Sequence, residues 1–216
     1  VTGTNAIVDW VWVELRASND NTNIVNGKSA LLQRDGDIVG LDGVSDLIMT
    51  AAPTNYFVVV KHRNHLGVMS NATITLNEST GTVVDFTSSG FTTFGNNART
   101  TFGMPVGVLA LWAGDGNGDG RLNYLGGFSE NTSIRSQVFT DPNNSVFGAP
   151  PIPTFPSLGY QNTDVDLNNV TKYLGGGSDI LHIRNNTLNH PSNSIFGAPP
   201  LPTYVFIQQL PEGANN

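Results

Sequence analysis

The alternation of apolar and polar side chains predicts β-strands in the first half of the chain. Ile7 to Leu15 is a β-prone run in which Trp10 and Trp12 share one face and three aliphatic side chains share the other. The polar stretch Arg16 to Lys28 follows, ends in Asn-Gly and is predicted as a loop.

Further apolar runs continue this pattern. Ala30 to Arg34, an Asp-Gly pair and Asp37 to Leu41 form a hairpin signature, because Asp-Gly fits a type I′ turn. The other predicted strands are Tyr56 to Lys61, Thr73 to Leu76, Val83 to Thr87 and Val106 to Trp112. Short strands at regular spacing are typical of a sandwich. The fold is therefore expected to be mainly β, with residues 1–112 as a β-sandwich domain.

The second half contains an internal repeat. Asp115 to Phe155 returns 49 residues later as Asp164 to Tyr204, and the two copies agree at 18 of 41 aligned positions. Each copy has an acidic loop, the sequence YLGG, an Ile-Arg pair and a proline run, "SVFGAPPIPTF" or "SIFGAPPLPTY". Such a duplication predicts two similar units that pack against each other. Residues 113–216 are therefore expected to form a duplicated module.

Two short helices are predicted in this module, Glu130 to Phe139 and Ile180 to Leu188. The side chains at helical spacing on one face are Ile134 and Val138 in the first, and Ile180, Ile183 and Thr187 in the second. Each helix follows its acidic loop directly, so an acid lies in or near its first turn.

The proline runs exclude helices and central strands. They are predicted as extended, polyproline-like straps over the module. A PxxP ligand (Pro150 to Pro153, Pro153 to Pro156) is the less favoured interpretation.

The first acidic loop has the spacing of a calcium site. Oxygen-bearing side chains stand at loop positions 1, 3 and 5, and glycine stands at position 6. Calcium prefers six to eight oxygen ligands, and glycine permits the tight turn. An EF-hand closes with an acid at position 12, whereas the next acid here is at position 16, so the loop is interpreted as extended by four residues. The proposed ligands are Asp115, Asn117, Asp119, the carbonyl of Arg121, Glu130 and, directly or through water, Asn123.

The second loop repeats this arrangement with two changes. Its proposed ligands are Asp164, Asp166, Asn168, the carbonyl of Val170 and Asp179. Asn168 is neutral where the first copy has Asp119, and Asn169 replaces glycine. Asparagine tolerates positive φ, so the turn is expected to survive while the site weakens. Two calcium ions are predicted, with metal-free Asx turns as the alternative.

These loops also carry a family resemblance. "GDGNGDGRLNYLGG…E" and "TDVDLNNVTKYLGG…D" resemble the paired calcium loops that end many secreted Bacteroidota-type proteins described as hemagglutinin-like or dockerin-like. The phrases "IVDWVWVELR", "ALLQRDGDIVGLDGVS", "VVVKHRNHLGVMS" and "QQLP" are similar to the same family. "APTNYFVVVKHRNH" resembles prealbumin-like sandwiches. The resemblance covers roughly Ala6 to Pro211 and implies an extracellular, calcium-bound, β-rich protein with an Ig-like or prealbumin-like sandwich and a dockerin-like module.

Composition supports the same class. The 216 residues fit one large or two small domains, and only 12% are charged, while Asn and Thr are abundant at 25 and 21. Such a surface is typical of β-rich extracellular proteins, with an ordinary acidic domain as the alternative. The net charge is −7, which the six proposed acidic ligands nearly account for. The chain has no basic stripe, which argues against a nucleic-acid partner.

Other features bear on location and assembly. There is no cysteine to form disulfides, and no apolar run approaches 18 residues, so no membrane span is expected. The chain begins at Val1 without a signal peptide, which indicates a processed or excised segment. The leader Val1 to Asn5 and the tail Glu212 to Asn216 are expected to be held by a neighbouring copy, because free termini fray and a strand-like terminus can complete the next sheet.

Several residue types have alternative interpretations. His62 and His65 could bind a metal, but no acid or third histidine lies nearby in sequence, so turn hydrogen bonding is favoured. The tryptophans could form a glycan platform, although core packing is the simpler expectation. Sequons that permit glycosylation without requiring it occur at Asn71, Asn77, Asn131, Asn143, Asn169 and Asn185.

No spacing marks a nucleophile with its base or a pair of catalytic carboxylates. The sequence therefore predicts a non-enzymatic, calcium-stabilised structural protein of the extracellular space or cell surface. Its expected role is a self-assembling, head-to-tail fibre subunit or an adhesin module. The alternative is a binding module for glycans or for a surface protein, in the manner of a dockerin.

Overall fold

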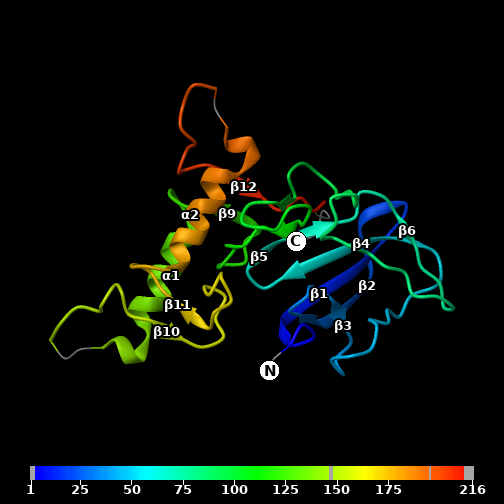
Figure 1. The fold of residues 1–216 in the computed structure, drawn as a ribbon, viewed down its shortest axis with the longest axis horizontal. Helices are drawn as coiled ribbons and strands as arrows, with labels where there is room; N and C mark the ends of the chain where they lie inside the picture. Colours follow the sequence, from blue (N-terminus) through cyan, green and yellow to red (C-terminus); the bar gives the residue numbers. More distant parts are fainter. Residues whose placement is uncertain (1–2, 146–147, 195, 212–216) are drawn as a thin grey trace. The chain divides into compact units, whose positions relative to one another are not determined.

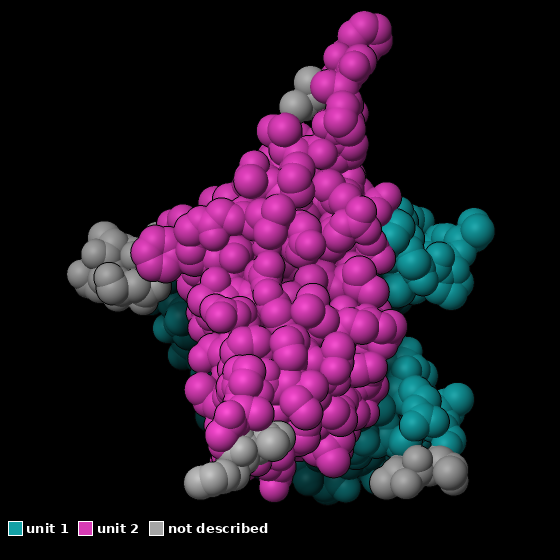
Figure 2. Space-filling view, turned by 90° about the vertical axis from the view of Figure 1, so that its left-hand side faces the viewer, with its two compact units in different colours: residues 1–62, 67–110, 209–216 teal, residues 63–66, 111–208 magenta. Residues whose placement is uncertain are grey.

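The computed structural model describes residues 3–145, 148–194 and 196–211, and these form a mainly β protein with 31% strand and 14% helix (Figure 1). The predicted fold class is confirmed at this level. Two compact units are present (Figure 2). The first contains residues 1–62, 67–110 and 209–216, and the second contains residues 63–66 and 111–208. The predicted domain division after residue 112 stays a prediction.

One antiparallel sheet dominates the first unit, with strand order β3-β2-β1-β4-β5 and with β6 beside β4. Its strands are β1 (Ile7–Ala17), β2 (Asp20–Gln33), β3 (Ile38–Val39), β4 (Asn55–His62), β5 (His65–Met69) and β6 (Ile74–Thr75). A two-stranded sheet pairs β7 (Arg99–Thr100) with β8 (Ala110–Leu111). The strands predicted at Ile7 to Leu15 and Tyr56 to Lys61 are confirmed by β1 and β4.

The alternation along β1 also follows the prediction. Val11, Val13 and Leu15 are buried, whereas Trp10 and Trp12 on the opposite face are 50% and 42% exposed. Trp10 and Trp12 are therefore not core residues, contrary to the simpler expectation, whereas Trp112 is a core residue as expected.

The loop predicted at Arg16 to Lys28 is wrong. Strand β2 begins at Asp20, three residues after β1 ends, and pairs with β1 as far as Gln33, opposite Ile7. The polar side chains of β2 have low β propensity. The strand forms because the tight turn places it beside β1, whose backbone supplies its hydrogen-bond partners. Gly27 of β2 lies beneath the Trp12 ring, which a Cβ at that position would overlap. The Asn-Gly pair is therefore part of the sheet rather than a turn.

Other strand predictions hold in part. The hairpin at Asp35-Gly36 is present, since β2 pairs with β3 beyond it. Only Gly36 has a positive φ (100°), so the turn is not type I′. Thr73 to Leu76 shortens to β6. No strand forms at Val83 to Thr87, and Val106 to Trp112 retains only β8, because Val83 and Val106 are 90% and 105% exposed and bury no apolar surface.

The second unit contains the two repeats and both α-helices of the described residues. Its elements are β9 (Arg121–Asn123), α1 (Glu130–Thr140), the 3₁₀ turn η1 (Pro142–Asn144), β10 (Ser157–Leu158), β11 (Val170–Thr171), α2 (Asp179–Asn189), the 3₁₀ turn η2 (Pro191–Asn193) and β12 (Val205–Ile207). Both predicted helices are confirmed within one residue at each end. Their predicted apolar faces are buried, with Ile134, Val138, Ile183 and Thr187 at 0% exposure.

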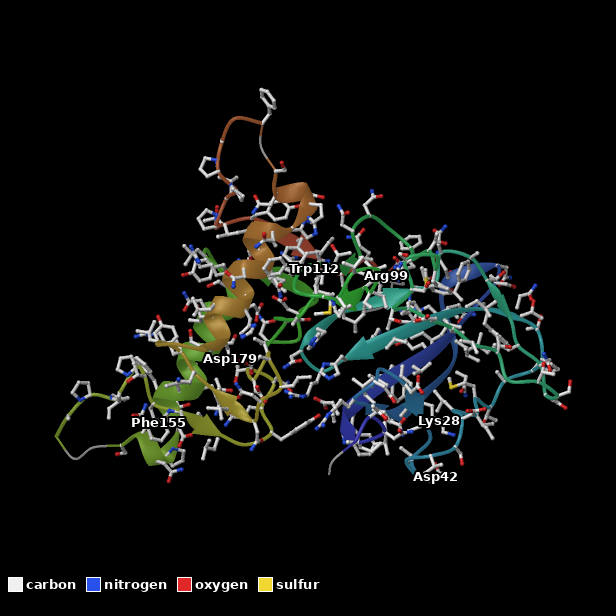
Figure 3. All side chains as sticks on the ribbon, viewed as in Figure 1. Lys28, Asp42, Arg99, Trp112, Phe155 and Asp179 are labelled. Atoms are coloured by element: carbon white, nitrogen blue, oxygen red, sulfur yellow. The ribbon has the colours of Figure 1, made fainter. Side chains whose placement is uncertain are left out.

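The two repeats share one core. Ile134 of α1 and Ile183 of α2 pack together with Trp112, Leu122 and Phe206, and α1 lies beside α2. Figure 3 labels Trp112, which is 1% exposed. The helices thus hold their N-terminal residues, and the acidic loops that precede them, against a common apolar centre.

The proline runs are straps only in part. The Pro153 carbonyl accepts a hydrogen bond from Leu174 N–H (3.3 Å) and the Pro202 carbonyl accepts one from Leu125 N–H (3.1 Å), so the end of each run contacts the YLGG segment of the other repeat. After each 3₁₀ turn the chain leaves the helix end as a loop, and in Figure 1 the two loops project from opposite ends of the helix pair. Phe196 in the second loop is 106% exposed. The prolines of each run lack the N–H groups that pairing in a sheet would need. The residues Val1, Thr2 and Glu212 to Asn216, for which contacts with a neighbouring copy are expected, lie outside the described residues.

Candidate metal centre

The first acidic loop wraps around its own oxygen atoms. The two carboxylate oxygens of Asp115 accept hydrogen bonds of 3.0 Å from the backbone N–H groups of Asp119 and Gly120. Asn117 Oδ1 accepts from Asp119, and Asp119 Oδ1 accepts from Arg121, each at 2.9 Å. Gly120 has the left-handed φ of 73° that this turn requires. The side chains at positions 1, 3 and 5 are thereby held on one side of the loop.

Glu130 closes the loop from the first position of α1 and is fully buried. Its Oε2 accepts hydrogen bonds from the N–H groups of Gly116 (3.0 Å) and Asn117 (3.2 Å). Its Oε1 is buried and has no hydrogen-bond partner among the described residues. A buried carboxylate oxygen without a partner is costly, so this atom indicates a missing ligand.

Three carboxylates meet at this point. One oxygen from each of Asp115, Asp119 and Glu130 lies within 4.8 Å of the others. Burial, followed by the charges of Asp115 and Asp119, raises the pKa of Glu130 to about 8. Burial also raises the pKa of Asp115 to about 6. Within the described part of the chain, no lysine, arginine or histidine forms an ion pair with these three acids.

A buried glutamate in the first unit shows the contrast. Glu14 is 2% exposed, but Arg16 and Lys61 lie 2.8 and 2.7 Å from its oxygens. Burial alone would raise the pKa of Glu14, yet the hydrogen bonds and charges of Lys61 and Arg16 outweigh it and lower the pKa. Glu14 is neutralised by basic side chains of the protein itself, whereas no basic side chain of the described residues forms an ion pair with Glu130.

The second loop reproduces the backbone of the first. The oxygens of Asp164 accept from the N–H groups of Asn168 (3.0 Å) and Asn169 (2.9 Å). Asn169 has a φ of 69°, which confirms that asparagine occupies the left-handed position. Leu167 also has a left-handed φ, 58°, where the first copy has Gly118. Asp164, Asp166 and Asp179 each place an oxygen within 4.8 Å of the others.

Asp179, at the first position of α2, differs from Glu130 in its bonding. Its Oδ1 accepts from Val165 N–H at 2.8 Å and its Oδ2 from Lys172 N–H at 2.7 Å. Burial raises the pKa of Asp179 to about 6. Figure 3 labels Asp179 near the middle of the helix pair. The second cluster thus has both oxygens of its closing acid satisfied by the backbone.

The remaining predicted ligands are Arg121, Asn123 and Val170, and each lies in or beside its loop. The N–H groups of Arg121 and Val170 donate to Asp119 and Asn168, at 2.9 and 2.8 Å, which places both residues in the loop wall. Asn123 donates from Nδ2 to the Gly127 carbonyl at 3.4 Å. The use of the Arg121 and Val170 carbonyls and of Asn123 as ligands stays a prediction.

The two loops meet through the start of the first. A Cβ added to Gly116 would lie 3.4 Å from the Asn162 carbonyl oxygen and 3.5 Å from Thr163 Cα. β9 nevertheless pairs with β12, and β11 pairs with β10, so the short strands of the two loops are not partners. The module therefore differs from an arrangement in which the strands of two calcium loops pair directly with each other.

The turn between β4 and β5 contributes residues that sequence reasoning missed. Asn64 is fully buried and donates from Nδ2 to the carbonyls of Asn162 (3.0 Å) and Asp164 (2.7 Å). The Arg63 guanidinium lies 3.9 Å from Asp164 and 4.3 Å from the centre of the Tyr160 ring. These contacts join residues about 100 positions apart, which no local pattern reveals.

The histidines of that segment pair with side chains. His62 Nε2 lies 3.1 Å from the carboxylate of Asp9, and His65 Nδ1 lies 2.8 Å from Asn64 Oδ1. The expected turn hydrogen bonding is thus present at His65.

The sequons occupy varied positions. Asn131 and Asn185 lie within α1 and α2, and Asn169 lies in the second acidic loop. The exposed sequon asparagines are Asn71, Asn77, Asn143 and Asn169. Glycosylation stays a prediction.

Comparison of the chain with protein-family models, with curated proteins and with solved structures finds no match. Within the described ranges, neither α-helix has the length and apolar character needed to cross a bilayer. The class of the site therefore follows from its own atoms. Two clusters of oxygen ligands could hold metal ions, and all-oxygen sets of this kind suit hard cations such as calcium, magnesium or manganese.

Proposed function

We propose that this chain is a non-enzymatic, calcium-stabilised structural protein of the extracellular space or cell surface, related to the secreted hemagglutinin-like or dockerin-like proteins that its sequence resembles. The observation that carries the proposal is the buried Oε1 of Glu130, which has no hydrogen-bond partner among the described residues and lies beside two further carboxylates. Calcium fits better than magnesium because a loop that offers both side-chain and carbonyl oxygens can supply the six to eight ligands that calcium takes. Asp115, Asp119 and Glu130 would hold the ion in the first loop, and Asp164, Asp166 and Asp179 in the second. The Ig-like and dockerin-like descriptions of the two units belong to this proposal.

The role proposed for the ion is to stabilise the fold. Each cluster lies directly before a helix whose apolar face is in the core of the second unit. An ion that neutralises the cluster would therefore stabilise the helix pair together with its loops. At a free calcium concentration 100-fold above Kd, one site adds about 2.7 kcal/mol to the free energy of unfolding.

The exposed proline loops support an assembling or adhesive role. Pro142–Thr154 and Pro191–Thr203 agree at 10 of 13 positions, whereas the preceding Asp115–Asp141 and Asp164–His190 agree at 8 of 27. Exposed loops usually vary more than the elements they connect. The shared "FGAPP" is uncharged, and its phenylalanine in the second copy, Phe196, is 106% exposed, so packing against the described residues gives no reason for this side chain. A contact with a second copy, head to tail, or with a surface partner is the proposed reason.

The metal proposal is tested by thermal unfolding in calcium and in excess chelator. Chelation is expected to lower Tm by about 5–10 °C per occupied site, since 1 kcal/mol corresponds to about 2–4 °C in a chain of this size. Asp119→Ala should lose most of the calcium response, and Glu78→Gln, at an exposed glutamate, should keep it. An unchanged Tm on chelation would return both loops to ordinary turns.

Assembly is tested on the same sample by light scattering. Long particles are expected in calcium, and Phe196→Ala should reduce them while Val83→Ala, at another exposed apolar residue, should not. A monomer under all conditions contradicts the fibre and leaves a monomeric adhesin module.

A second candidate is favoured by a specific observation. Trp10 and Trp12 stand two residues apart on one face of β1, half exposed, with Trp12 lying over Gly27. Exposed aromatic rings in a row are suited to stacking on sugars. Glycan-array binding that Trp12→Ala abolishes and Trp112→Phe leaves intact would support a glycan-binding module. Docking through the helices is disfavoured, because Ile134, Val138 and Ile183 are buried.

A further inference from the structure

The two acidic clusters differ in the hydrogen bonds made by their closing acids, Glu130 and Asp179. In the first, one oxygen of Glu130 is buried without a partner in the described structure. In the second, both oxygens of Asp179 accept backbone hydrogen bonds of 2.7 and 2.8 Å. Aspartate is one methylene shorter than glutamate, so its carboxylate stays against the backbone at Val165 and Lys172. The first cluster requires a further ligand, and the second does not.

The second cluster also has basic side chains beside it. Arg63 lies 3.9 Å from Asp164, and His182 Nε2 lies 3.3 Å from Asp166. The position of Arg63 is determined by two further contacts, a hydrogen bond to the Gln161 carbonyl and the Tyr160 ring beneath the guanidinium. A guanidinium stays charged at all physiological pH values. It therefore offsets part of the negative charge that would attract a cation.

The ligand set of the second loop is weaker as well. Asn168 stands where the first loop has Asp119, but Asp166 stands where it has Asn117, so both sets carry three carboxylates. The Nδ2 of Asn168 donates to Asp166 Oδ2 at 2.9 Å, a shorter bond than the 3.4 Å one from Asn117 Nδ2 to Asp119 Oδ2, and it uses an oxygen that an ion would need. Leu167 and Asn169 adopt left-handed φ values of 58° and 69° without glycine, so the loop is also strained.

We infer that the module has one high-affinity calcium site, formed by Asp115, Asp119 and Glu130, and that in the second loop Arg63 acts as an internal cation that replaces most of the metal's structural role. This inference rests on the proposed function and deepens it. The second loop keeps the shape of a calcium loop without depending on the ion, while the first depends on it.

The test is calcium titration of the whole chain by isothermal calorimetry. One ion is expected to bind tightly, and a second at least about tenfold more weakly. Glu130→Gln should abolish the tight event, and its counterpart Asp179→Asn should leave that event within about twofold. Arg63→Gln should tighten the weaker event by about tenfold, because it removes a positive charge close to the ligands, whereas Arg63→Lys should leave it unchanged.

The outcomes separate the two proposals. If no calcium binds, the proposed function fails. If two ions bind with equal affinity, the proposed function stands and the inequality of the sites is overturned. The inference is also overturned if Asp179→Asn loses the tight calcium-binding event, or if Arg63→Gln leaves the affinity of the weaker event unchanged. Circular dichroism of each variant in chelator verifies that it is folded before its affinity is compared.

Discussion

The side-chain oxygen of Asn193 accepts a 2.9 Å hydrogen bond from the backbone N–H of Leu201, across the base of the second proline loop. Its Nδ2 donates to the carbonyls of Thr187 and Leu201, at 2.8 and 2.9 Å. Asn144 makes the same three bonds in the first repeat. One buried asparagine in each repeat thus joins the helix end to both sides of its loop.

Asn193→Ala is expected to lower the free energy of unfolding by about 2–4 kcal/mol, because it leaves buried backbone groups without partners. The measurement is urea unfolding, with the exposed Asn189→Ala as the matched control. Asn144→Ala should have a similar effect. Equal stability of Asn193→Ala and Asn189→Ala would show that water replaces these bonds.

The metal-free protein is expected to lose stability as pH rises. The pKa of Glu130 is raised from 4.5 to about 8 in the folded chain, so between these values the folded protein binds more protons than the unfolded chain. The free energy of unfolding then falls as pH rises through this window, by on the order of 5 kcal/mol for a difference from 4.5 to about 8 at about 1.4 kcal/mol per pKa unit. Thermal unfolding in chelator at pH 5 and pH 8 measures it.

Calcium should reverse this trend, since its binding displaces protons from the carboxyl groups. Glu130→Gln in chelator should remove most of the pH dependence, because the neutral amide does not titrate. A metal-free protein more stable at pH 8 than at pH 5 would contradict the raised pKa.

Leu167→Gly is expected to stabilise the second loop. Leucine at a φ of 58° costs about 1 kcal/mol relative to glycine, part of which the greater flexibility of unfolded glycine offsets. A net gain of about 0.5–1 kcal/mol should appear in chemical denaturation. The reciprocal Gly118→Leu, in the same conformation at 74°, should destabilise, and an opposite sign for either variant would refute the strain argument.

Gly27→Ala is expected to disturb the exposed tryptophan face. A Cβ at this position would overlap the Trp12 ring, so the indole must swing away, at a cost of about 1 kcal/mol. The tryptophan emission should shift toward that of a solvated indole. Gly90→Ala, where a Cβ would meet only Ser88 Oγ at 3.6 Å, should leave stability and emission unchanged.

Local patterns in the sequence determined a substantial part of this protein. The helical spacing of Ile134 and Val138, the opposite faces of Trp12 and Val13, and the left-handed turn at Asn169 all follow from neighbours within a few residues. The spacing of the acids brought Asp115, Asp119 and Glu130 together as predicted, because a tight loop and the following helix suffice to place them. Such features depend on short-range geometry and can therefore be predicted from the sequence alone.

The tertiary structure decided what depends on distant partners. β2 forms over a polar segment because β1 supplies its hydrogen bonds, while the apolar Val83 and Val106 stay exposed because no sheet receives them. Arg63 lies near Asp164, 101 positions away in the sequence. Asn193 joins the two sides of a loop by hydrogen bonds that the spacing of residues does not predict. The charge balance of the two acidic loops is therefore a property of the fold: no basic side chain of the described residues forms an ion pair with Glu130, whereas the Arg63 guanidinium lies 3.9 Å from Asp164.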